Sequence, residues 1–355
     1  MSRSGTYSLI SEACRAGALS AIAQINADSD LDFTLHAVER DPEGNVDRYE
    51  PMCRDILDST SARHVVGCVT SWSRKEVIPT LERAGATLWY SVPYEGFEAS
   101  DHVVYTHACP NQHLLPLLDW AIPTYGNRAY LIGSNYIWGW EMNRIARQEI
   151  AMQGGEILGE RYLPIGSPDV ELMIREIAST RPDFILNSMI GRSQYQFIAA
   201  YHELGKTDPH FLPDNCPIMS CNLTEAELPA LGDATEGLIA VGPYFRGSKV
   251  WPGEQNFNSS HEASTYTAVR ELARLLALCP NAENLSLAEL LRIDGAAVGI
   301  IDAQNHHTRL PVLIGQVEGG AFAIRRQFAP IMGDPYLSRG RGELEEVPPN
   351  LRVVS

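Results

Sequence analysis

Apolar and polar residues alternate along the first third of the chain in a pattern typical of repeated helices and strands. Helices are indicated where apolar residues recur at helical spacing, and strands where they alternate with polar residues or form short runs. This order predicts a parallel sheet with helices on both faces. The helices are expected at 11–26, about 47–59 and 73–83, and the strands at 33–38, 65–69, 87–90 and 103–105.

The alternation starts again after residue 113 and predicts a second sheet of the same kind. A Gly/Pro/Ser-rich connection at 247–260 then leads to a long helix at about 262–278. Two further strands, 310–317 and 321–327, flank Glu318-Gly319-Gly320 and indicate a hairpin. The second round is expected to contain helices at 114–122, 140–153, 170–179 and 193–204, and strands at 129–133, 156–162, 184–188, 217–220 and 238–241.

Two rounds of alternation predict an α/β protein with two doubly wound, parallel-sheet lobes. The elements after the second sheet are expected to return to the first lobe, so the chain crosses between the lobes several times and forms a hinged clamshell. The first crossover is placed near 115–127. The N-terminal lobe is expected to contain residues 1–120 plus about 246–328, and the C-terminal lobe 121–245 plus about 329–355.

The sequence predicts that the first lobe lacks one strand. A doubly wound lobe normally begins with a strand, whereas this chain runs directly into helix 11–26. An empty position in the sheet would expose two strand edges and part of a core. We therefore expect the natural start codon to lie upstream, in codons that encode an apolar, strand-like segment.

Charge and composition narrow the function classes. The 355 residues include 28 Lys and Arg against 44 Asp and Glu, a formal net charge of −16, which disfavours nucleic acids and anionic membranes as direct partners. No stretch resembles a membrane span or a secretion signal, which predicts a cytoplasmic protein, or a periplasmic one if a missing N-terminus carried a signal peptide. Seven cysteines without a CxxC motif argue against a disulfide framework. Cys53 on a predicted helix and Cys68 on the next strand could lie within bridging range in an oxidising compartment.

Motifs of common enzymes are absent from the sequence, which contains no phosphate loop, HExxH, GxSxG or dinucleotide fingerprint. His306 and His307 are adjacent and lack a third ligand at metal-binding spacing, so we interpret them as a loop or surface pair. An amide-hydrolysing enzyme would need a base beside Cys68 or Cys109, and none is evident. The sequence predicts a protein without catalytic residues, metal or cofactor.

Three polar and aromatic clusters follow predicted strands, at the carboxyl edges where open α/β sheets bind ligands. In the first, Ser71 or Ser73 is expected to cap a helix whose free N–H groups face the edge; an ordinary structural cap is the alternative. The others are 89–98 and 133–140. Hydroxyls, aromatic rings and amides dominate, with no Arg or Asp aimed inward, which favours a small neutral solute.

Several stretches, in order along nearly the whole chain, carry a family resemblance. The chain resembles the cytoplasmic amide sensor that regulates aliphatic amidase expression and, more distantly, the urea and short-chain amide binding proteins of ABC transporters. Both have the type I periplasmic-binding-protein fold. The matching stretches are 41–49, 66–68, Arg74-Lys75, 93–98, 110–112, Gly133-Ser134 with Tyr136, 224–227, 243–245, 304–310 and 334–336.

The resemblance implies a ligand pocket and also marks departures from it. Ser71, Tyr90 and Tyr136 match amide-pocket residues of the sensor. At other pocket positions this chain has Val69 for a Tyr, Val92 for a Thr, Trp138 for a Tyr and Asn222 for a Thr, so acetamide specificity does not follow. The expected ligand-binding residues are Val69, Ser71, Tyr90, Val92, Pro93, Tyr136, Trp138 and Asn222.

Two partners are compatible with this pocket. The leading hypothesis, implied by the resemblance, is a sensor for a short-chain aliphatic amide or urea-like compound that sequesters an antiterminator protein and thereby regulates amidase expression. The alternative is a periplasmic substrate-binding protein of a urea or amide ABC transporter, whose partner is a membrane permease. The sequence leaves open whether the chain forms a homo-oligomer.

Overall fold

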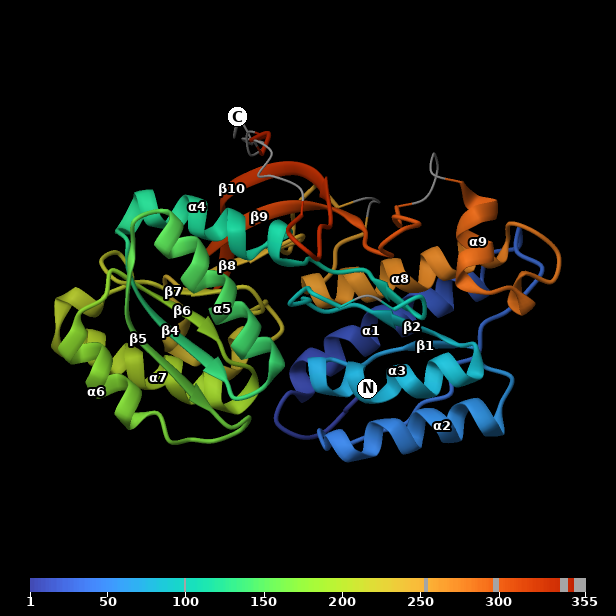
Figure 1. Cartoon of the computed structure of the whole chain (residues 1–355), viewed down its shortest axis with the longest axis horizontal. Helices are drawn as coiled ribbons and strands as arrows, with labels where there is room; N and C mark the ends of the chain where they lie inside the picture. Colours follow the sequence, from blue (N-terminus) through green and yellow to red (C-terminus); the bar gives the residue numbers. More distant parts are fainter. Residues whose placement is uncertain (99, 252–254, 296–299, 339–343, 348–355) are drawn as a thin grey trace.

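The structure is a computed structural model, and it describes residues 1–98, 100–251, 255–295, 300–338 and 344–347. Two lobes lie side by side, and the N-terminus lies on the face seen in Figure 1. Within the described residues the strands form two sheets, one of three strands and one of seven. The predicted clamshell of two α/β lobes is confirmed.

Lobe one is built on a parallel sheet of order β1-β2-β3. The middle strand β2 is buried along its whole length, in keeping with its Leu-Trp-Tyr run. Helix α8 packs against α1 although the two are far apart in sequence (Figure 1). The elements are α1 (Ser8–Asn26), α2 (Tyr49–Ser59), β1 (His64–Val66), α3 (Ser71–Ala84), β2 (Thr87–Tyr90), β3 (Val103–Tyr105), α8 (Ser260–Leu276) and α9 (Leu287–Asp294).

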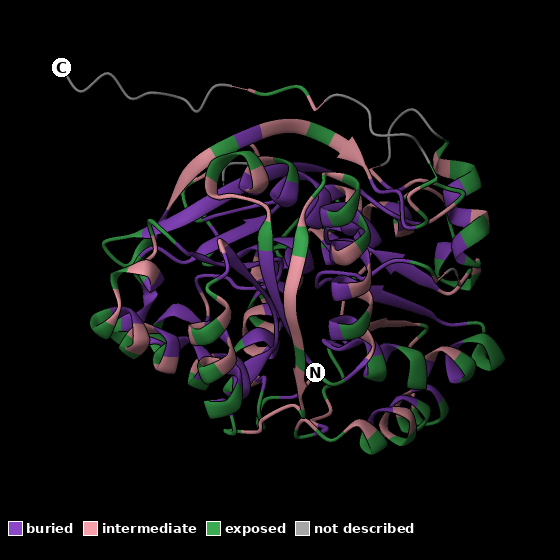
Figure 2. Ribbon diagram, turned by 60° about the vertical axis from the view of Figure 1, so that its left-hand side comes forward, coloured by how far each residue is buried: buried purple, intermediate pink, exposed green. Residues whose placement is uncertain are grey.

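Lobe two is built on a sheet of order β10-β9-β8-β7-β6-β4-β5, in which β4 to β8 are parallel. Its central strands are buried and its outer helices carry the exposed positions (Figure 2). The elements are α4 (Leu114–Tyr125), β4 (Arg128–Ser134), α5 (Ile137–Met152), β5 (Glu156–Leu163), α6 (Glu171–Thr180), β6 (Phe184–Ser188), α7 (Gly191–Thr207), β7 (Ile218–Ser220), β8 (Ile239–Gly242), β9 (Arg309–Glu318) and β10 (Ala321–Met332).

The hairpin β9-β10 corrects the predicted lobe boundaries. Its antiparallel pairing is as expected, but β9 also pairs with β8, so the hairpin belongs to lobe two and not to the first lobe. Eight consecutive residues of β9 are buried, because the strand pairs on both sides within the larger sheet. The boundary drawn at residue 120 also falls inside α4, a continuous helix packed against α5.

The strand predicted at 33–38 does not form. Half-buried and exposed side chains alternate only over residues 33–36, residues 36–38 are all exposed, and the segment has no ladder partner among the described strands. The backbone N–H and C=O of Leu35 bond instead to the side chain of Asn26, at 2.8 and 2.9 Å. Strand β1 pairs only with β2 among the described strands. The expected upstream strand stays a prediction.

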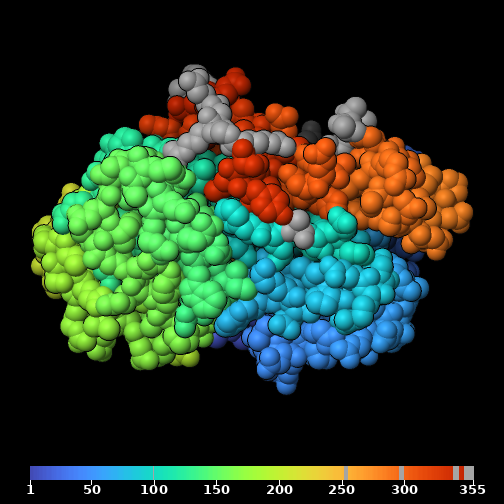
Figure 3. Space-filling view, in the orientation of Figure 1, coloured from blue at the N-terminus to red at the C-terminus, as the bar shows by residue number. Residues whose placement is uncertain are grey.

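The two lobes are in contact on the face shown in Figure 3. One apolar cluster continues from lobe one into lobe two, because it includes Tyr90 and Val92 together with Tyr136 and Trp138. The molecule is therefore in a closed arrangement. None of the described helices combines the length and the apolar character that a membrane span requires.

Candidate functional site: a cavity at the junction of the lobes

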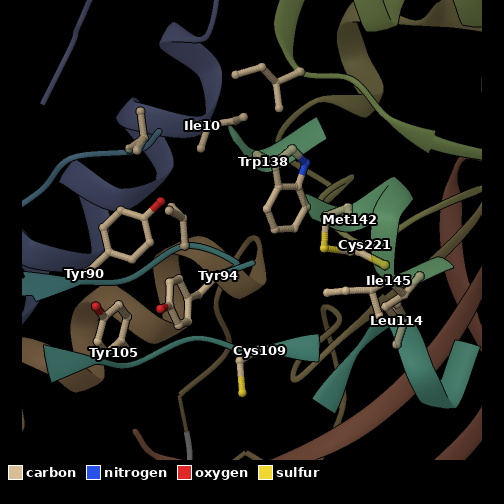
Figure 4. Close-up of a cluster of buried hydrophobic side chains, with 14 of the residues drawn as sticks. Ile10, Tyr90, Tyr94, Tyr105, Cys109, Leu114, Trp138, Met142, Ile145 and Cys221 are labelled. Atoms are coloured by element: carbon tan, nitrogen blue, oxygen red, sulfur yellow. The ribbon is translucent and has the colours of Figure 1, made fainter. Parts of the chain in front are cut away.

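A cavity of about 20 Å³ lies where the lobes meet. All eight residues expected from the sequence to bind ligand line it. The residues that sequence reasoning missed are Ile10, Ile190 and His261. In Figure 4, Ile10 and Tyr90 approach from lobe one, and Trp138 approaches from α5 in lobe two. In this closed arrangement the space is about that of one or two water molecules, since one water needs roughly 10–15 Å³.

The cavity lies at the carboxyl ends of parallel strands in both lobes, as expected for open α/β sheets. Tyr90 is the last residue of β2, and Ser71 begins the helix that follows β1. In lobe two, Tyr136 immediately precedes α5, and Asn222 lies two residues beyond the end of β7. The fold therefore brings together side chains that are distant in sequence.

The helix cap at the cavity differs from the prediction. The N-cap of α3 is Thr70, whose hydroxyl accepts from the backbone N–H of Ser73 at 3.2 Å in a reciprocal capping box. Because Thr70 and Ser73 satisfy the helix end, the hydroxyl of Ser71 is not needed there. It donates to Glu95 Oε2 at 2.8 Å.

A buried charged cluster lies behind Ser71. The guanidinium of Arg74 is fully buried, 2.6 Å from Glu95 and 2.8 Å from Glu98, and Lys75 also contacts Glu98. Burial alone would raise the pKa of Glu98, but attraction to Arg74 outweighs it and holds that pKa at about 2. Two cations thus face two carboxylates, and the cluster leaves no net charge for a ligand to match.

Aromatic rings form much of the cavity wall. Arg74 lies over the ring of Tyr90, 4.7 Å from its centroid, and so holds that ring from behind. The ring of Tyr136 lies 5.4 Å from that of Trp72. Trp138 meets His113 edge to face at 5.9 Å. Burial raises the pKa of Tyr136, so this phenol stays neutral at any physiological pH.

Asn222 is fixed by its neighbours in lobe two. Its amide nitrogen donates to Met189 O at 3.1 Å and to Gln194 Oε1 at 3.3 Å. Its amide oxygen accepts from the hydroxyl of Ser220 at 3.1 Å. The side chain is therefore a rigid part of the wall, with little hydrogen-bonding capacity left for a ligand.

The cysteines and the histidine pair considered in the sequence form neither a disulfide nor a metal site among the described residues. All seven cysteines, Cys53 and Cys68 included, are free thiols. Burial raises the pKa of Cys68 to about 12 and also raises that of Cys109, which disfavours the thiolate that a nucleophile needs. His306 Nδ1 lies 3.2 Å from Val103 O, and the ring of His307 stacks on Tyr105 at 4.4 Å.

Comparison with known proteins defines the family. Residues 1–341 match the model of the periplasmic binding protein domain. The chain belongs to this family. Its members are solute-binding proteins, which agrees with the prediction of a binding protein rather than an enzyme. The amidase regulator identity is a finer assignment than this match provides.

Solved structures share the fold at low sequence identity. An ABC transporter solute-binding protein from Rhodopseudomonas palustris, in complex with benzoate, has a TM-score of 0.80 at 18% identity over 94% of this chain and 96% of its own. One from strain HaA2 with p-hydroxybenzoic acid has 0.78 at 17%, over 94% and 96%. A leucine binding protein from Thermotoga maritima has 0.76 at 14%, over 93% and 97%. The likeness establishes the fold and not the ligand.

Proposed function

We propose that this protein is a solute receptor that closes its two lobes on a short-chain amide or a urea-like compound. The observation that supports the proposal most directly is the cavity itself, which side chains of both lobes line. A ligand there would contact both lobes at once and would stabilise the closed arrangement by its preference for it.

The charges around the cavity favour a neutral solute. Arg74, the cation behind the wall, is already paired with Glu95 and Glu98. A carboxylate ligand would have to compete with these two acids, and an ammonium group would lie close to the guanidinium. The small volume further favours a ligand of few atoms over benzoate or leucine, unless the lobes open.

A ligand panel tests this proposal. Acetamide, propionamide and urea, each titrated to millimolar concentration, should raise the melting temperature; at 100 times Kd the stabilisation is about 2.7 kcal/mol, or roughly 3–5 °C for a chain of this size. Acetate, leucine and benzoate, which carry charge, serve as matched controls. Failure of every short amide and of urea to shift the melting curve would refute the proposal.

For the partner we favour the hypothesis that the protein delivers its ligand to an ABC permease, because the solved structures that share its fold are described as ABC transporter proteins. In that case the protein works outside the inner membrane. The second candidate is the cytoplasmic sensor that holds an antiterminator, which the sequence stretches at 41–49 and 93–98 support. Adjacent permease and ATPase genes would support transport, whereas adjacent amidase and antiterminator genes would support the sensor.

A further inference from the structure

Two side chains of the cavity carry a buried nitrogen atom without a partner. Among the described residues, His261 Nδ1 and Trp138 Nε1 are buried and form no hydrogen bond. His261 is 1% exposed and Trp138 3% exposed. An unpaired buried polar atom is destabilising, so two of them on one cavity require an explanation.

The two residues approach from opposite lobes. His261 is the second residue of α8 in lobe one, where its ring lies 5.4 Å from that of His107. Trp138 is the second residue of α5 in lobe two. One molecule that satisfied both nitrogens would therefore link the lobes directly.

Other polar groups of the wall are already engaged within the protein. The hydroxyl of Ser71 donates to Glu95, and both ends of the Asn222 amide are bonded to neighbours. Among the described side chains that line the cavity, His261 Nδ1 and Trp138 Nε1 are thus the buried polar atoms without a hydrogen bond.

The chemistry of the two rings specifies what a ligand must offer. An indole N–H only donates, so Trp138 requires an acceptor such as a carbonyl oxygen. Burial lowers the pKa of His261 to about 4, so its imidazole is neutral at pH 7 and has one accepting and one donating nitrogen. A neutral imidazole offers no charge to an anion but accepts well from an amide N–H.

We propose that His261 and Trp138 hold the ligand from opposite lobes, with Trp138 Nε1 donating to a carbonyl oxygen and His261 Nδ1, in the tautomer that carries its proton on Nε2, accepting from an N–H of the same molecule. The inference rests on the proposed function and sharpens it, because the ligand must then be a neutral amide or urea with a free N–H. Neither Ser71, Tyr90 nor Tyr136 imposes that requirement, since a hydroxyl both donates and accepts.

The test measures dissociation constants by calorimetry for acetamide and for the isosteric pair N-methylacetamide and methyl acetate, of which only the first has an N–H. His261→Leu should weaken acetamide binding about tenfold, and His261→Gln should recover part of the loss. Replacing Trp138 with benzothienylalanine, which keeps the ring shape without the N–H, should weaken acetamide and N-methylacetamide alike by about tenfold. In the wild type, N-methylacetamide should bind more tightly than methyl acetate, and His261→Leu should abolish that preference.

Matched controls are Trp140→Phe and His36→Leu. Trp140 lies on the same helix as Trp138 but is 43% exposed, and His36 is also exposed. Both controls should bind like the wild type, and circular dichroism confirms that each variant is folded. If the wild type binds acetamide and both test variants bind it with a dissociation constant within twofold of the wild type, the proposed contacts of His261 and Trp138 are wrong and the proposed function stands. If the wild type binds no amide and no urea, both proposals fail.

Discussion

Lobe one pairs the buried Glu95 and the half-buried Glu98 with cations, whereas the buried Glu225 and Glu227 of lobe two form no salt bridge with the described residues. In lobe one, Glu95 and Glu98 pair with Arg74, and the pKa of Glu98 falls to about 2. In lobe two, burial raises the pKa of Glu225 and Glu227 to about 7. One oxygen of each lacks a hydrogen bond among the described residues. At pH 7, Glu98 is therefore an anion, whereas Glu225 and Glu227 are about half protonated.

The difference shows that burial alone does not decide the charge of a carboxyl group. Desolvation favours the neutral acid in both lobes, and the guanidinium of Arg74 reverses the outcome in lobe one. Lobe two offers weaker compensation: Arg246 N donates to Glu225 at 2.6 Å, and the Tyr195 hydroxyl donates to Glu227 at 3.1 Å. Neither bond brings a full charge to the carboxylate.

Removing the cation of lobe one should have the largest effect. Arg74→Met leaves the buried Glu95 without a cation, whereas Glu98 keeps Lys75, and we expect a loss of about 3–5 kcal/mol in the free energy of unfolding at pH 7. Urea denaturation measures the loss. The control Arg144→Met, whose guanidinium is partly exposed over Phe97, should cost about 1 kcal/mol or less. A similar cost for both variants would show that Arg74 does not compensate the buried acids.

Removing a carboxyl group of lobe two should instead raise the free energy of unfolding. The folded pKa of Glu227 is about 7 against an ordinary value of 4.5, so its contribution to stability is full below about pH 4.5 and is lost as the pH rises through 7. Glu227→Gln should stabilise the protein by about 1–3 kcal/mol at pH 8 and have little effect at pH 4.5. Denaturation at the two pH values measures this, with the exposed Glu171→Gln as the control. Destabilisation at pH 8 would contradict the comparison.

Much of the fold was predictable because it depends on local patterns. The strands at 87–90, 103–105 and 184–188 match the structure residue for residue, since short apolar runs between polar segments specify buried strands. The pairing of β9 with β8 was not predictable, because alternation marks a strand without naming its neighbour. The segment 33–38 makes the same point, as it has the pattern of a strand but no ladder.

The cavity was predictable where a resemblance marked its residues. Eight side chains identified in this way lie together. His261 was missed because it comes just before the helix predicted at 262–278, and only the packing of α8 against α1 brings it to the cavity. Ile190 follows the carboxyl end of β6. Open α/β sheets bind ligands at the carboxyl ends of their strands, and applying this rule to every predicted strand would have found Ile190. The charge states of the buried glutamates depend on contacts that no local pattern contains.

Lobe one also buries histidines that stay neutral at pH 7, in contrast to its ionised Glu98. Acid should therefore destabilise the protein by protonating these histidines. His307 is 1% exposed and stacks on Tyr105, and burial lowers its pKa to about 4. A folded pKa below the unfolded value of about 6.5 gives stability that is full above pH 6.5 and lost as the pH falls toward 4. His307→Phe keeps a ring on Tyr105 and removes this titration. From pH 7.5 to pH 5 it should therefore lose about 1–2 kcal/mol less than the wild type, measured by urea denaturation at each pH. The exposed His36→Phe should follow the wild type, and an equal acid loss in His307→Phe would mean that His307 is not held neutral by the fold.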